Sequence, residues 1–424
     1  MSRRGTWYTA IVVALAAVGA CGDGDGLRSG PDPTDPAGPS DPEPPGPPEP
    51  PAPPPEPPAG NILSIAGGGR NVPERFTSDL WVHGGYAYTG TWGGFERDGN
   101  PGNALKIWAL EPGGAPVLTD SIVLSGVGTV SDVEVSADGQ VLMLSAERGE
   151  REGLYLYDLA DPERPTLLDS VHVGGGLHTA TFGEIGSRRY AFTAKNPVNP
   201  ALRIFDVTDP GAITPAASVP IPPTYGIHDT YVREGLAFVF AWNAGVIIYD
   251  VGHGIRGGTP ESPVEVSRLV TSDGGVAGSP AVHNGWWFHN PATEEARYLF
   301  IGQEGPGQIG LSSSGDIHVV DVADLANPRE VATFRLPEAG AHNFWMDEPA
   351  GILYAAYYTG GVVALDVSGT LSGDLSDRLI GHVRPDEDGT TYTWGVMLAD
   401  GRLYASDMLS GLWQIAVASS SRTD

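Results

Sequence analysis

Four histidines of this 424-residue chain occupy one equivalent position in a repeated stretch of sequence. Neutral imidazole is a borderline ligand that iron, copper and zinc all accept, so three or four converging imidazoles would suffice to hold such an ion. With a metal bound there, oxidation of a small substrate is conceivable chemistry. The candidate metal ligands are His178, His228, His283 and His342.

A structural interpretation of the same histidines stays open. Repeats copy structural residues, and each imidazole could hydrogen-bond a backbone group of the neighbouring repeat. The set is also incomplete, since three copies of the repeat carry Ser78, Ser131 and Trp394 at this position. The sequence therefore makes a transition metal a candidate cofactor without requiring one. The other histidines share no position and are expected to be solvated or locally bonded: His83, His172, His253, His289, His318 and His382.

Short strands joined by tight turns must position the four histidines. In the copy HDTYVREGLAFVFAWNAGVIIYDV (228–251), apolar runs are separated by the turn sequences REG and NAG. Seven such copies start roughly 50 residues apart, the spacing of one four-stranded propeller blade. We therefore expect an all-β, seven-bladed β-propeller over residues 61–417. In the fourth copy the strands are predicted at 228–232, 236–242, 246–251 and 264–270.

The two ends of this array complement each other. Residues 61–66 (NILSIA) form a lone strand before the first full copy, whereas the last copy, at 394–417, supplies only three strands. An open ring would leave strand edges exposed. We therefore expect the N-terminal strand to close the last blade.

The third strand of each copy carries the most regular pattern. Sequences such as LRIFDVTDP (202–210) and DIHVVDVADLANP (316–328) contain an aspartate followed by a turn. A short carboxylate there can accept hydrogen bonds from the backbone N–H groups of the turn. We assign a structural role to these aspartates, which are Asp158, Asp206, Asp250, Asp321 and Asp366.

The repeats resemble the LVIVD-repeat family of bacterial and archaeal surface propellers. The resemblance rests on the core [LIV]-x-[IV]-x-D-[VL]-x-D/N-P and on first strands that start with His-Asp or Ser-Asp, and it covers about residues 61–417. It implies a propeller but no particular activity. The first copy departs from the pattern, because LKIWALEP (105–112) lacks the aspartate.

One face of the predicted propeller collects the residues best placed to bind a ligand. In an up-and-down blade, the connection between the second and third strands lies on the same face as the start of the first strand, beside the histidines. Two of these connections are long, at 91–104 and 302–315, and loops on a rigid scaffold usually carry function. The ligand-face candidates are Trp92, Glu147, Lys195, Trp242, Glu304, Trp394 and Asp407.

The N-terminus predicts export and lipidation. Arg3 and Arg4 precede an apolar run at 10–20, which is shorter than the ~20 residues of a membrane span. The sequence VGAC (18–21) resembles the bacterial lipoprotein box, which implies cleavage before Cys21, the chain's only cysteine, and acylation of that residue. We expect residues 1–21 to be a signal peptide and Cys21 to anchor an extracytoplasmic protein, on the outer membrane if the cell has one. An ordinary secretory signal is the alternative.

Residues 22–60 have the composition of a disordered linker. The segment is rich in proline and acidic residues and has no apolar pattern, so it cannot bury enough surface to fold and should be stiff and extended. The last residues, 418–424, are expected to be a disordered tail. The formal net charge of −28 argues against nucleic acid as a partner, because nucleic-acid binding needs a basic surface.

The sequence favours a cell-envelope lipoprotein whose propeller binds a protein, a glycan or a small ligand through the histidine-bearing face. A metal-dependent redox enzyme built on the four histidines is the alternative, and a purely structural envelope protein is a third. No residue is assigned a catalytic role, and whether the protein is an enzyme stays open.

Overall fold

The computed structural model describes residues 57–69, 75–93, 101–111, 114–195, 199–221, 226–272, 280–305, 315–337, 339–386 and 391–418. The chain divides between Pro54 and Pro55 into two units, and the first lies outside the described residues. The predicted signal peptide, Cys21, most of the linker and all but Ala418 of the predicted tail fall outside them as well. No helix in the described part of the chain is long and apolar enough to cross a bilayer.

The described part of the second unit is all-β, apart from a single 3-10 turn, η2, at Ser376–Arg378. Consecutive strands pair antiparallel in sheets of four, and two such groups are joined into one larger sheet by the pairing of Thr91 with Val130. The joined groups are β2 (Phe76–His83), β3 (Tyr86–Trp92), β4 (Ala104–Ala109) and β5 (Val117–Val123), and β6 (Thr129–Val135), β7 (Val141–Glu147), β8 (Gly153–Asp158) and β9 (Thr166–His172).

The remaining sheets follow the same up-and-down plan, and the short strand β25 (Gly373–Asp374) adds in parallel to β21. One sheet contains β10 (Thr179–Ile185), β11 (Arg188–Lys195), β12 (Ala201–Asp206) and β13 (Thr214–Pro220). The next contains β14 (Asp229–Arg233), β15 (Leu236–Phe240), β16 (Val246–Asp250) and β17 (Val264–Leu269). Then come β18 (Val282–Asn290), β19 (Glu295–Gln303), β20 (Ile317–Asp321) and β21 (Arg329–Phe334). They are followed by β22 (Phe344–Asp347), β23 (Ile352–Ala356), β24 (Val362–Asp366) and β26 (Leu379–Val383).

The first and last strands of the unit share one sheet. Its order is β1 (Leu63–Gly68), β29 (Gly411–Val417), β28 (Arg402–Asp407) and β27 (Thr393–Ala399). Leu63 pairs with Val417 and Ile65 with Ile415, antiparallel. The strand predicted at 61–66 thus lies beside the last copy of the repeat.

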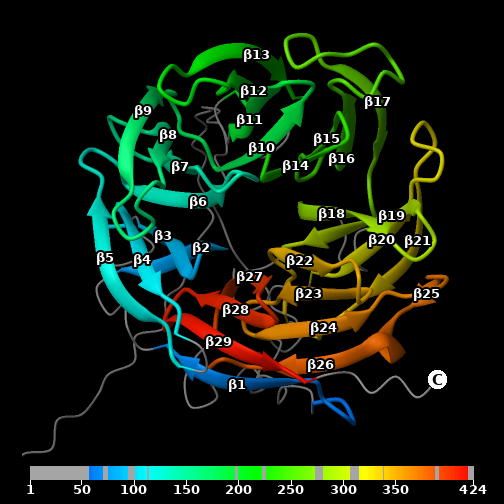
Figure 1. The fold of residues 1–424 in the computed structure, drawn as a ribbon. Coiled ribbons are helices and arrows are strands. Elements are labelled where there is room, and N and C mark those ends of the chain that lie inside the picture. Colours follow the sequence, from blue (N-terminus) through cyan, green and yellow to red (C-terminus); the bar gives the residue numbers. More distant parts are fainter. Residues whose placement is uncertain are drawn as a thin grey trace, which may run out of the picture. The chain divides into compact units, whose positions relative to one another are not determined.

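The sheets are arranged around a common centre, with β6, β10, β14, β18 and β22 innermost and β9, β13, β17 and β21 outermost (Figure 1). The fold is therefore propeller-like. The strands predicted for the fourth copy are found within one or two residues of their expected bounds, as β14 to β17.

The hydrophobic core lies between neighbouring sheets. Phe192 and Ile204, from β11 and β12, pack in one buried cluster with Val239 and Ile247, from β15 and β16. Middle strands such as β16 (VIIYD) are buried along their whole length, which explains their continuous apolar sequence. Each sheet therefore stabilises the next, and this stacking fixes where the inner strands begin.

The aspartates at the ends of the third strands hold the turns that follow, as predicted. In β8, β12, β20 and β24 the carboxylate accepts the backbone N–H two residues later. Asp250 accepts three such bonds, from Gly252, Gly254 and Arg256 at 3.0, 3.1 and 2.6 Å. Although burial of Asp250 works against the charge, these N–H groups stabilise it and lower the pKa to about 2. The structural assignment of these aspartates is confirmed.

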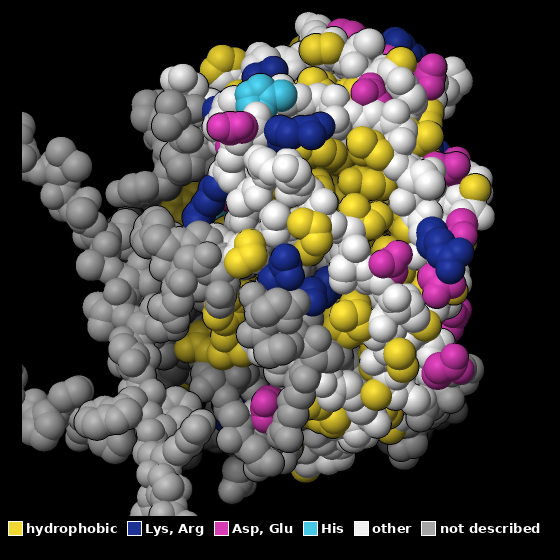
Figure 2. All heavy atoms as spheres, turned by 90° about the vertical axis from the view of Figure 1, so that its left-hand side faces the viewer, with side chains coloured by type: hydrophobic (Ala, Val, Ile, Leu, Met, Phe, Trp, Pro, Cys, Tyr) yellow, Lys and Arg dark blue, Asp and Glu magenta, His cyan; other side chains and the backbone are white. Residues whose placement is uncertain are grey.

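The outer strands present a mixed surface. Figure 2 turns the side of Figure 1 that carries β5 and β9 to the viewer and shows hydrophobic side chains interspersed with acidic and basic ones. Val117 and Val123 on β5 and Leu167 on β9 are exposed. On the part of this face that the structure describes, charges of both signs are scattered, with no continuous basic stripe.

Candidate metal centre

The four histidines lie where the inner strands begin, and the strand pairing is irregular at this position in several copies of the repeat. The register of β18 against β19 skips His283, and the registers of β6 and β27 skip Ser131 and Trp394 at the equivalent positions. Such bulges re-aim side chains and recur beside functional sites. In the other copies the histidine comes just before the strand: the backbone N–H of His178 donates to the carbonyl oxygen of Ala194 at 2.7 Å.

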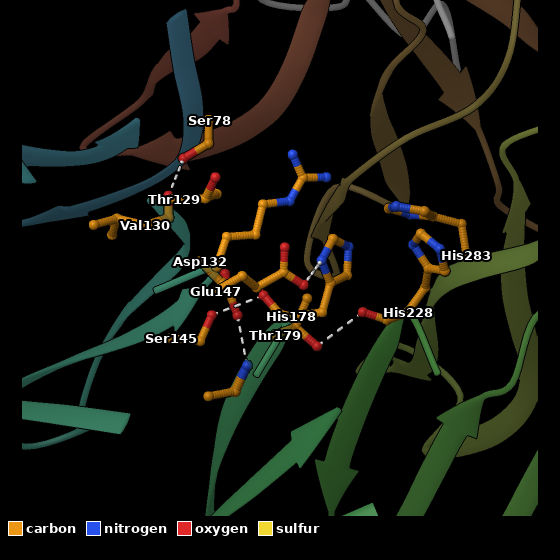
Figure 3. Close-up of polar contacts among 12 residues, drawn as sticks. Ser78, Thr129, Val130, Asp132, Ser145, Glu147, His178, Thr179, His228 and His283 are labelled. Atoms are coloured by element: carbon orange, nitrogen blue, oxygen red, sulfur yellow. Dashed lines mark hydrogen bonds and ion pairs between the residues drawn. The ribbon is translucent and has the colours of Figure 1, made fainter. Parts of the chain in front are cut away.

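The imidazole rings form a continuous row. Ring centroids are 4.6 Å apart for His178 and His228, 4.9 Å for His228 and His283, and 4.1 Å for His283 and His342. His178, His283 and His342 are buried and His228 is half-buried. Figure 3 shows the rings of His178, His228 and His283 projecting into the same space from separate strands.

Two sets of three residues could hold a metal ion. In each set, one ligand atom from every residue lies within 4.8 Å of the others. The first set is His178, His228 and His283, and the second is His283, Glu304 and His342. A carboxylate oxygen of Glu304 lies 3.9 Å from Nδ1 of His228 and 3.9 Å from Nε2 of His283. The sets share His283 and therefore form one continuous cluster.

Hydrogen bonds at the two ends of the row orient the outer rings. Nδ1 of His178 lies 2.9 Å from Oε1 of Glu147 (Figure 3). Nδ1 of His342 lies 2.6 Å from the carbonyl oxygen of Trp394, and because a carbonyl only accepts, this nitrogen must carry the proton. Nε2 of His342 then has a free lone pair. This is the outer-shell arrangement by which metal-ligating imidazoles are held.

Three imidazole nitrogens in the row are buried without a hydrogen-bond partner in the described structure. They are Nδ1 of His228, Nδ1 of His283 and Nε2 of His342. Leaving a buried polar group unpaired costs about 1–3 kcal/mol. Packing between repeats accounts for Nδ1 of His178 and of His342, but it leaves Nδ1 of both His228 and His283 without a hydrogen bond among the described residues.

Burial keeps most of the row neutral. Burial, followed by repulsion from neighbouring imidazoles, lowers the pKa of His228 and of His283 well below its usual range. Burial likewise lowers the pKa of His342. His178 differs, because the carboxylate of Glu147 outweighs the effect of burial and raises its pKa. Burial also raises the pKa of Glu304. Neutral imidazoles offer the lone pairs that metals bind.

Aromatic side chains enclose the row. The ring of Trp242 stacks on His228 at 4.3 Å, and that of Trp394 lies 4.4 Å from His342. The hydroxyl of Tyr358 donates to Oε1 of Glu304 at 2.5 Å. Trp242 and Tyr358 both follow the second strand of their sheet, and both have positive φ, 49° and 38°. Left-handed backbone is unfavourable for bulky residues and is found at functional sites.

No family model and no curated protein matches this chain.

Five of the seven predicted ligand-face residues surround the histidines. Glu147, Glu304, Trp242 and Trp394 contact them as described, and the Trp92 ring lies 6.0 Å from His178. Trp394 is buried, because it packs against the rings of Trp92 and Tyr358.

The other two predicted residues have different surroundings. Lys195 lines a separate cavity together with Arg203, and none of the four histidines borders it. The carboxylate of Asp407 accepts backbone N–H groups of Tyr392, Leu409 and Ser410. Asp407 thus holds a turn of the protein's own chain, and its place among the ligand-face residues stays a prediction.

Sequence reasoning missed a set of acidic residues one position after the histidine position of the repeat. Asp79, Asp132 and Asp229 follow Ser78, Ser131 and His228. Asp132 reaches the next sheet, where Oδ2 accepts the backbone N–H of Ala180 at 2.8 Å (Figure 3). The sequence does contain these aspartates, in its Ser-Asp and His-Asp pairs. From the sequence alone, however, the pairs indicate only where each repeat starts.

Proposed function

We propose that this protein is a binding module that holds a transition-metal ion among His178, His228, His283, His342 and Glu304. The observation that carries the proposal is the set of buried imidazole nitrogens with no hydrogen-bond partner among the described residues. Three of the four imidazoles are kept neutral by burial, and a bound cation would satisfy their free nitrogens. The mixture of imidazoles and one carboxylate suits iron, zinc or copper.

The metal would serve recognition through the histidine-bearing face. A set of three protein ligands leaves a coordination position open, as at catalytic zinc sites. The enclosing tryptophans favour a small ligand or the tip of a larger one, with its donor atom on the ion. The alternative is a redox enzyme at the same centre, and the hydrogen bond from Tyr358 to Glu304 favours it, because it places an oxidisable phenol beside the candidate ligands.

Metal analysis of the full-length protein tests this proposal. We expect about one tightly bound transition-metal ion per chain after purification without chelator, because a preformed set of three or more ligands binds such ions strongly. The double substitution His228→Ala plus His283→Ala should abolish binding. The matched control is His172→Ala, an exposed histidine outside the row, which should retain the metal. A wild-type protein that stays metal-free after exposure to iron, copper and zinc would contradict the proposal.

The rest of the molecule is proposed to serve this module as follows. The sheets form a seven-bladed propeller closed by β1, which is supported by the pairing of β1 with β29 and by the three-stranded last copy of the repeat. The resemblance to LVIVD-repeat surface propellers and the VGAC sequence before and at Cys21 support a lipid-anchored protein on the extracytoplasmic side of a bacterial membrane. Its partners would be the membrane and a protein, glycan or small ligand.

A further inference from the structure

A cavity of about 220 Å³ lies among the inner strands and includes none of the histidines. All seven strands that begin the predicted repeats contribute to its wall: β2, β6, β10, β14, β18, β22 and β27, with Asn343 just before β22. Its volume is below the ~300–1,000 Å³ of pockets for drug-sized ligands. The cavity could therefore accept only a small molecule.

The ionisable side chains of the cavity wall are acidic. Among the described residues, four carboxyl groups line it, from Asp79, Asp132, Glu134 and Asp229, and no lysine, arginine or histidine does. Burial and repulsion from Asp132 raise the pKa of Asp229 to about 8 and that of Glu134 well above its usual range. These shifts favour the protonated form of the carboxyl groups, and a bound cation would stabilise their carboxylates.

An arc of aromatic rings completes the wall. The ring of Trp81 lies 5.9 Å from that of Trp345, Trp345 lies 5.4 Å from Trp286, and Trp286 lies 5.3 Å from Tyr231. All four side chains are half-buried and line the cavity. The face of an aromatic ring attracts cations, and tryptophan does so most strongly.

One amide in the cavity wall is incompletely hydrogen-bonded. Asn284 lines the cavity and is 3% exposed, and its side-chain oxygen has no hydrogen-bond partner in the described structure. This oxygen can accept a hydrogen bond from a ligand N–H or O–H group.

A purely structural role accounts for only part of this arrangement. Glu134 accepts the backbone N–H of Phe182 at 3.1 Å and so ties two sheets together, as Asp132 does. These bonds do not require four carboxylates to share one small cavity with four aromatic rings. Carboxylates supply the opposite charge for an ammonium group, while aromatic rings favour its alkyl substituents over a bare metal ion.

We infer that the cavity binds a small organic ammonium ion, held by the carboxylates of Glu134, Asp132 and Asp229 against the aromatic arc of Trp81, Trp345, Trp286 and Tyr231. The cation sits on the axis of the sheets, below the histidine row and separate from it. The inference does not depend on the proposed metal, because no residue of the candidate metal sets lines this cavity.

Calorimetric titration of the full-length protein with tetramethylammonium tests the inference. Saturable binding of one ion per chain is expected at constant ionic strength. Glu134→Gln keeps an oxygen for the N–H of Phe182 but removes the charge, and it should weaken binding about tenfold or more. Trp286→Leu should do the same, whereas Trp286→Phe keeps an aromatic face and should retain most of the affinity. Glu184→Gln, at an exposed position, is the matched control and should bind like wild type.

The possible outcomes are distinct. No saturable binding by the wild-type protein overturns the inference, as does unchanged affinity in both Glu134→Gln and Trp286→Leu. Binding of Ca²⁺ in place of tetramethylammonium overturns it too, since the aromatic arc would then have no role. A variant whose unfolding midpoint equals that of the wild-type protein is folded. The His228→Ala plus His283→Ala protein should still bind tetramethylammonium, so this result is independent of the metal experiment.

Discussion

At the scale of single residues, the two ends of the histidine row differ from its middle. His178 and His342 each engage a protein acceptor through Nδ1, while Nδ1 of His228 and of His283 has no acceptor among the residues that the structure describes. A ring whose Nδ1 is hydrogen-bonded to the protein presents its Nε2 in a fixed direction. In the proposed metal centre, the outer ligands would already be oriented, and the inner ligands would gain a partner when an ion binds.

Glu147 is the side chain through which this orientation can be tested. Glu147→Gln keeps the shape but removes the charge that raises the pKa of His178 and holds its Nδ1 proton. We expect about 10- to 100-fold weaker metal binding, the usual effect of losing a residue that supports a ligand. Competition with a coloured chelator measures it.

Its control is Glu150→Gln, three residues along the chain and exposed, which should leave the affinity unchanged. Equal affinities for the two variants would mean that Glu147 does not support a ligand.

At the scale of elements, the start of each inner strand determines which side chains lie at the candidate site. In β18, for example, the pairing with β19 skips His283. Its side chain therefore does not follow the regular alternation of side chains between the two faces of the sheet. The next residues then return to the regular pattern and supply the cavity wall, as Asn284 and Trp286 do. His228 and Asp229 are consecutive, whereas the other cavity carboxylates come from β2 and β6, which carry serine at the histidine position.

The strand β1 tests how the ends of the array are held together. Deleting residues 61–68 would leave β29 with an unpaired edge and expose buried Leu63 contacts. Because unpaired edges associate with other chains, we expect a lower urea midpoint and oligomers on size-exclusion chromatography. An equally long deletion in the proline-rich segment, residues 42–49, should change neither. A β1 deletion that remains monomeric and as stable as wild type would contradict the proposed closure.

At the scale of the whole molecule, the proposed anchor and spacer set where the binding face operates. The proline-rich residues 22–60 are expected to extend by about 3 Å per residue. That length would hold the β unit well away from a membrane in which Cys21 is lipidated, so that large partners could approach it.

Cys21→Ala is expected to release the protein from the membrane fraction, because the chain would lose its acyl groups. Immunoblotting of membrane and soluble fractions measures this. Asp23→Ala, two residues along, is the control and should stay in the membrane fraction. Retention of Cys21→Ala at the wild-type level would contradict lipidation.

The strands, the turns and the repeat follow from local patterns in the amino-acid sequence. Period-2 apolar runs, turn glycines and the recurring aspartates act over a few residues, so the sequence alone predicts β14 to β17 and the role of Asp250. The equivalence of the four histidines is visible in the sequence for the same reason, since a repeat places equivalent residues at equivalent points.

Which side chains meet depends on the packing of the sheets. Glu304 and His342 are 38 positions apart, and their convergence depends on how successive sheets stack and on where each strand pairing slips. The same stacking buries Trp394 and collects Asp132, Glu134 and Asp229 around one cavity. Such contacts arise from packing between distant segments, and local sequence patterns carry no information about them.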